Sequence, residues 1–81
     1  MIGIEEVKND IETLVNKAIA LADAADAVKE TASIREIEAL EKRALGYFAA
    51  ARALLNAYAD LHNEMIDIPQ FVRLRRLQRQ Y

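Results

Sequence analysis

Only a few residues in this 81-residue chain have side chains suited to catalysis or metal binding. His62 is the only histidine, and Asp60 and Glu64 flank it two residues away on either side. On a helix, residues two apart point to different sides, so these carboxylates do not join His62 in a metal site. A Glu-x-x-His pair of the kind that binds iron in helical bundles would need glutamate where Ala59 stands. We therefore expect the histidine to be a solvated or interface residue.

The other residue types that could do chemistry have structural explanations. The chain has no cysteine, and its single serine, Ser33, stands three residues before Glu36 in a Ser-x-x-Glu capping box. Glu5 and Glu6 lie at an expected helix start, where the positive end of the helix dipole favours acidic residues. The sequence also lacks a glycine-rich loop that could bind phosphate. We expect no catalytic residue, no cofactor, no bound metal and no enzymatic activity.

The C-terminal segment carries the strongest charge feature of the chain. Residues 73–81 hold four arginines and no acid, a balance of +4, whereas residues 1–72 hold seven basic and thirteen acidic residues, a balance of −6. The expected partner-binding residues in this segment are Arg73, Arg75, Arg76, Arg79 and Tyr81. Arginine presents a flat fork suited to carboxylate or phosphate, and arginine and tyrosine are enriched at protein-binding hot spots.

Three interpretations of this segment remain open. Its cations could complement the acidic body of the chain, bind a partner protein, or contact nucleic acid. Nucleic-acid binding is the weaker alternative, because an acidic body repels phosphate and no helix-turn-helix spacing accompanies the arginines. We expect no membrane contact, because a short basic amphipathic helix is a weak anchor.

Two runs of apolar residues predict the helices that carry these groups. Spacings that alternate between three and four residues keep side chains on one stripe of a helix. The first run is Ile4, Val7, Ile11, Leu14, Ala18, Leu21, Ala25 and Val28. The second run is Ile37, Leu40, Ala44, Tyr47, Ala51, Leu54, Tyr58, Leu61, Met65 and Ile68. We expect helices over about 4–30 and 34–66, the second starting at the capping box.

The short connection between these helices predicts an antiparallel hairpin over residues 1–68. Pro69 suits the first turn of a helix and disfavours helical geometry at Ile68, so a short basic helix or tail over 69–81 follows. Two alternatives remain open. The chain could bend at 31–33 without a clean break, since no glycine ends the first helix, or Gly46 could divide the second helix.

The apolar stripes are wider than the contact between two helices requires. Twelve residues after Pro69 are too few to cover a hairpin whose helices are roughly 40 Å long. We therefore expect a homodimer in which two hairpins form a four-helix bundle. This layout resembles Rop-type helical dimers in architecture only. The expected core and dimer residues are Ile11, Leu14, Ile19, Leu40, Tyr47, Phe48, Leu54, Leu55, Tyr58 and Leu61.

Composition limits the classes of protein that remain. The chain is 53% hydrophobic with fifteen alanines and a net charge of −2, and it has neither a basic leader nor a long apolar run. We expect a cytoplasmic, all-α homodimer that acts as a protein-binding regulator or inhibitor, of the kind that phages and plasmids encode. The alternative is a nucleic-acid-binding accessory protein that uses the C-terminal arginine segment.

Overall fold

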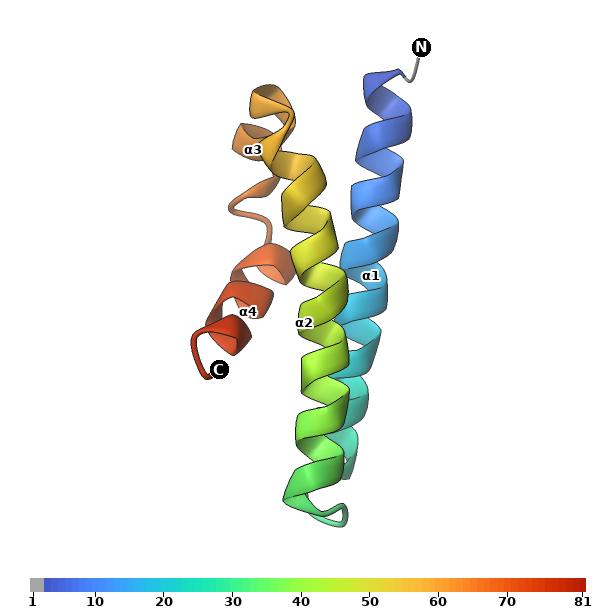
Figure 1. Ribbon diagram of the computed structural model, residues 1–81, viewed down its shortest axis with the longest axis vertical. Coiled ribbons are helices and arrows are strands. Elements are labelled where there is room, and N and C mark those ends of the chain that lie inside the picture. Colours follow the sequence, from blue (N-terminus) through green and yellow to red (C-terminus); the bar gives the residue numbers. More distant parts are fainter. Residues whose placement is uncertain (1–2) are drawn as a thin grey trace.

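The computed structural model describes residues 3–81, and in that range it contains four helices and no strand. The helices are α1 (Ile4–Val28), α2 (Ile34–Asn56), α3 (Ala59–Met65) and α4 (Pro69–Gln78). α1 and α2 form a long antiparallel hairpin, while α3 and α4 return along the other side of α2 (Figure 1). The all-α class and the helical hairpin are confirmed.

The turn between α1 and α2 follows the capping signal in the sequence. α1 ends at Val28, close to the expected end near residue 30, and α2 begins at Ile34 as predicted. Ser33 has an extended backbone, and its hydroxyl accepts a hydrogen bond from the Glu36 amide at 3.2 Å. The Thr31 amide donates to the Val28 carbonyl at 3.0 Å and helps to close the turn without a glycine. The helices are therefore separated by a clean break, and the alternative of a bend is wrong.

The second helix is shorter than the sequence predicts. Instead of one helix over 34–66, α2 ends at Asn56, and Tyr58 adopts an extended conformation before α3 begins. The antiparallel neighbour α1 begins at Ile4, so a helix that continued past Tyr58 would extend beyond the end of α1. Folding back lets α3 bury Leu61 and Met65 against the core. This burial explains why the apolar periodicity continues although the helix does not.

Gly46 lies inside α2, and the alternative of a helix break at this position is wrong. A Cβ atom added to Gly46 would meet nothing within 4 Å, so no contact inside the chain requires a glycine here. A glycine in a helix interior costs roughly 1 kcal/mol relative to alanine. α2 tolerates this cost because its other face is packed in the core.

The core lies between the α1–α2 hairpin and the returning segment of α3 and α4. Phe48 of α2 and Phe71 of α4 are fully buried and meet edge to face, with ring centroids 4.8 Å apart and planes at 70°. The buried cluster comprises Val7, Ile11, Val15, Ala18, Ala22, Ala44, Phe48, Ala51, Leu55, Leu61, Met65, Phe71 and Leu74. The chain itself therefore covers part of one face of the hairpin, and it does so with α3 and α4 together and not with the twelve residues after Pro69 alone.

The expected core residues fall into three groups. The buried ones are Ile11, Phe48, Leu55 and Leu61. The partly buried ones are Leu14, Ile19, Leu40, Tyr47 and Leu54. Tyr58 is 37% exposed at the break between α2 and α3, which corrects its expected place on the core stripe.

Replacing Phe71 with alanine should lower the free energy of unfolding by about 3–5 kcal/mol, because the substitution leaves a cavity against Phe48. The measurement is urea unfolding followed by helical circular dichroism at a fixed protein concentration. Val72→Ala is the matched control, since Val72 is the next residue of α4 and is only half-buried. Equal losses in the two variants would show that α4 does not pack through Phe71.

Candidate functional site

α4 is the element that positions the C-terminal arginines. Pro69 lies in the first turn of the helix. Phe71 and Leu74, three residues apart on one face, are fully buried in the core. Leu77 continues this face and is partly buried. The arginines therefore lie on the flanks and the outer face of a helix whose orientation is fixed by packing.

Arg73 joins α4 to α1 through two carboxylates. Its terminal nitrogens donate to Asp23 Oδ1 and, at 2.9 Å, to Asp26 Oδ2. Asp23 and Asp26 are three residues apart on α1, so both reach the same side of the helix. The hydrogen bond that Arg73 donates to Asp23 is the main cause that raises the pKa of Arg73, and the Asp26 charge adds to it. Exposed ion pairs are each worth only about 0–1 kcal/mol, so the fork mainly orients α4.

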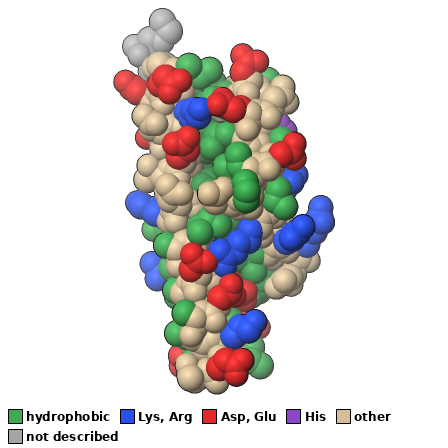
Figure 2. Space-filling view, turned by 180° about the vertical axis from the view of Figure 1, so that it is seen from behind, with side chains coloured by type: hydrophobic (Ala, Val, Ile, Leu, Met, Phe, Trp, Pro, Cys, Tyr) green, Lys and Arg blue, Asp and Glu red, His purple; other side chains and the backbone are tan. Residues whose placement is uncertain are grey.

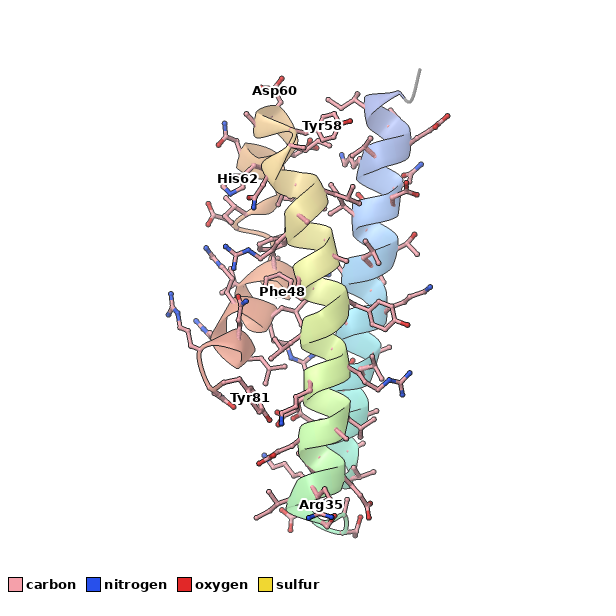
Figure 3. All side chains as sticks on the ribbon, in the orientation of Figure 1. Arg35, Phe48, Tyr58, Asp60, His62 and Tyr81 are labelled. Carbon is pink, nitrogen blue, oxygen red and sulfur yellow. The ribbon has the colours of Figure 1, made fainter. Side chains whose placement is uncertain are left out.

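The end of α4 also contacts α2. The Tyr81 hydroxyl donates to Glu41 Oε1 at 2.5 Å, and Lys42 Nζ lies 6.0 Å from the centroid of the Tyr81 ring. Arg52 of α2 donates to Gln78 Oε1 at 2.8 Å. The bond to Glu41 raises the pKa of Tyr81 to about 12. Figure 3 shows Tyr81 at the end of the chain, beside the hairpin.

The remaining arginines differ in their surroundings. Arg75 Nη2 lies 3.9 Å from Asp67 Oδ1, just beyond hydrogen-bond distance. Arg76 and Arg79 are exposed, and neither has an ion-pair partner within residues 3–81. Three of the five expected partner-binding residues thus lie against acidic groups of the chain itself. Arg76 and Arg79 keep exposed charges, although Arg76 also lines a shallow pocket that contains Asp26 and Glu41. Figure 2 shows basic and acidic side chains interspersed on the face seen from behind.

A second surface lies on the other face of the hairpin, and its residues Leu14 and Tyr47 are among the expected core and dimer residues. We call it the open groove, and it is lined by Leu14, Arg43, Gly46, Tyr47 and Ala50. One residue along a helix turns about 100° around its axis, so Tyr47 leaves the face on which Phe48 meets α4. Lys17 of α1 lies across the groove, with its Nζ 5.7 Å from the centroid of the Tyr47 ring. The groove is largely apolar and is uncovered by any described part of the chain.

The residues around His62 do not converge on one point. Figure 3 shows Asp60 and His62 pointing in different directions from α3. Glu64 instead accepts a hydrogen bond from Lys8 Nζ at 2.6 Å, which links α3 to α1 and raises the pKa of Lys8. Within residues 3–81, no three His, Asp or Glu side chains gather as they would around a metal ion.

No protein-family model, curated protein or solved structure matches this chain. In the described range, none of the helices has the length and apolar character needed to cross a membrane. The function is therefore inferred from the two surfaces described above, the open groove and the outer face of α4.

Tyr81→Phe should remove the late step, near pH 12, from the ultraviolet titration, since Tyr81 loses its proton near pH 12 in the folded chain. The folded pKa lies above the ordinary value of 10.0, so the bond to Glu41 stabilises the fold below about pH 10. That stabilisation is lost as pH rises from about 10 toward 12, and the melting temperatures of wild type and variant should converge there.

Tyr58→Phe serves as the control for this titration, because Tyr58 is exposed at the break after α2 and lies far from Tyr81 (Figure 3). This variant should keep the late step. Loss of the late step in Tyr58→Phe, or its survival in Tyr81→Phe, would contradict the contact between Tyr81 and Glu41.

Proposed function

We propose that this protein is a non-enzymatic helical homodimer that acts by binding another protein, as a regulator or inhibitor. The observation that carries the proposal is the open groove, an apolar surface on a hairpin whose other face is already closed by α3 and α4. Exposed apolar surface of this kind marks protein interaction sites in small proteins. Pairing of two hairpins through it would give the four-helix arrangement expected from the width of the apolar stripes.

We assign the contact with a second protein to the outer face of α4. Arg76 and Arg79 extend from a helix whose inner face is fixed by Phe71 and whose flank is fixed by Arg73. A rigid base lowers the entropic cost of binding, and the planar guanidinium fork pairs well with carboxylates. An acidic patch on a partner protein fits this surface best.

Nucleic-acid binding through the arginine segment is the alternative. Affinity for nucleic acid depends on how many phosphates a protein neutralises. Arg73 already faces Asp23 and Asp26, and Arg75 lies near Asp67, so these cations are partly neutralised by the chain itself. Two outward arginines on an acidic protein favour a protein partner over a polyanion.

Light scattering tests the homodimer. We expect a particle of twice the 9.1 kDa chain mass, and we expect Leu14→Glu to reduce it to a single chain by placing a charge in the open groove. Ala49→Glu is the control, because Ala49 is exposed and does not line the groove. A wild-type particle of 9.1 kDa that is folded and helical at all concentrations would contradict the homodimer.

Capture experiments test the contact with a second protein. A protein retained by the wild-type chain should be lost from an R76Q/R79Q bait and kept by a K29Q/R35Q bait. The control residues carry the same charges at the turn of the hairpin, far from α4, where Figure 3 labels Arg35. Equal retention by both variants would exclude the outer face of α4.

Titration of labelled duplex DNA and RNA separates the two classes of partner. The protein-binding proposal expects no binding at low salt. Tight binding that falls steeply with salt, and that R76Q/R79Q abolishes, would favour the nucleic-acid alternative.

A further inference from the structure

We infer that two copies of the chain pair through the open groove, with a two-fold axis that crosses it at Leu14 and Tyr47. The inference rests on the proposed homodimer, and it adds the surface and the register of the pairing. Three features of the groove support it: two parallel rows of residues, a separation of opposite charges along its length, and small residues beside Tyr47.

Helical spacing extends the lining of the open groove into two rows of residues, one on each helix of the hairpin. The row on α1 is Asp10, Leu14, Lys17 and Leu21. The row on α2 is Leu40, Arg43, Tyr47, Ala50 and Leu54. Both rows follow steps of three and four residues, which keep each row on one side of its helix. Leu14 and Tyr47 line the groove together, so the rows lie side by side at this level.

Opposite charges lie on the two sides of the level of Leu14 and Tyr47, cations toward the turn of the hairpin and an acid away from it. Because α1 and α2 are antiparallel, Lys17 and Arg43 both lie toward the turn of the hairpin. Along the helix axes, Lys17 is about 4.5 Å from Leu14 and Arg43 is about 6 Å from Tyr47. Asp10 lies about 6 Å from Leu14 in the other direction. Within residues 3–81, no ion pair neutralises Asp10, Lys17 or Arg43.

A two-fold axis perpendicular to the helices exchanges the two directions along the groove. With the axis over Leu14 and Tyr47, α1 of each copy faces α1 of the other, so Asp10 comes opposite Lys17 of the other copy, while Arg43 of that copy lies at the same level on the adjacent helix. The apolar residues at the axis meet their own equivalents, as an isologous interface requires. If the two hairpins instead paired with their helices running in the same direction, Lys17 and Arg43 of one copy would lie against Lys17 and Arg43 of the other. Such like-charge contacts disfavour that arrangement.

The small residues beside Tyr47 leave space for a second hairpin. Gly46 and Ala50 are exposed in the groove, and a Cβ atom at Gly46 would contact nothing inside the chain. A second copy seated there would remove the Tyr47 ring and Leu14 from water, which favours association. The pairing therefore combines apolar burial at the axis with charge complementarity on both sides of it.

A charge exchange between two variants tests the register by light scattering and analytical ultracentrifugation. Each contact of the dimer joins residue 10 of one copy to residues 17 and 43 of the other. D10K therefore places three cations in each contact of its own dimer, and K17E/R43E places three anions there. We expect each variant alone to dissociate with a dimer dissociation constant raised by roughly tenfold or more. An equal mixture should restore dimers, because both contacts of the mixed pair then join opposite charges.

E12K is the matched control, because Glu12 lies on α1 beside Gln70 of α4 and Met65 of α3, away from the groove. It should dimerise like wild type. Circular dichroism verifies that every variant remains helical, and Asp10→Asn gives the same direction of change with a smaller disturbance of α1. Its dissociation constant should rise by less than that of D10K.

The outcomes separate the register from the homodimer itself. Dissociation of both single variants with recovery in the mixture supports the inference. A dimeric wild type whose dimer survives D10K, or whose charge variants do not recover on mixing, overturns the register and leaves the homodimer standing. Dissociation of E12K to the same extent as D10K also overturns the register. A monomeric wild type overturns both proposals.

Discussion

Phe71 packs edge to face against Phe48, and this contact determines which surfaces of the protein remain free. A hairpin of two helices exposes two grooves, one on each side of the plane that contains both axes. Docking of α4 through Phe71 and Leu74 fills one groove with the protein's own side chains. The other groove keeps its apolar residues in contact with solvent, and the same docking leaves Arg76 and Arg79 exposed. Both candidate surfaces are therefore consequences of one packing contact.

Local signals predicted the parts of the fold that depend on local interactions. The capping box at Ser33 and Glu36 predicted the start of α2, because its hydrogen bond joins residues three apart. Alternating apolar spacing predicted the helices, and the short connection between them predicted the hairpin, because both signals depend on residues that are close in the sequence. The break after Asn56 has no glycine or proline to announce it, and it depends on where the antiparallel neighbour α1 begins. Tyr58 continues the apolar pattern and lies at the break all the same.

The candidate site was predictable as a set of residues and not as an arrangement. The arginines of the C-terminal segment are visible in the sequence. That Arg73 is paired within the chain depends on Asp23 and Asp26, about fifty residues earlier. The choice of Phe48 over Tyr47 as the residue that meets α4 also depends on the tertiary register, since both side chains are aromatic and adjacent. The open groove followed from that choice.

The contacts of α4 join the most distant parts of the chain. The fork of Arg73 spans 50 residues to Asp23, whereas the hairpin closes over a turn of a few residues. Contacts that close long loops form late in folding, and short helices with few buried side chains are the first to open. In hydrogen exchange, the amides of α4 should therefore lose protection before those of α1 and α2. Transient undocking of α4 would briefly expose Phe48 and the part of the second groove that α4 covers.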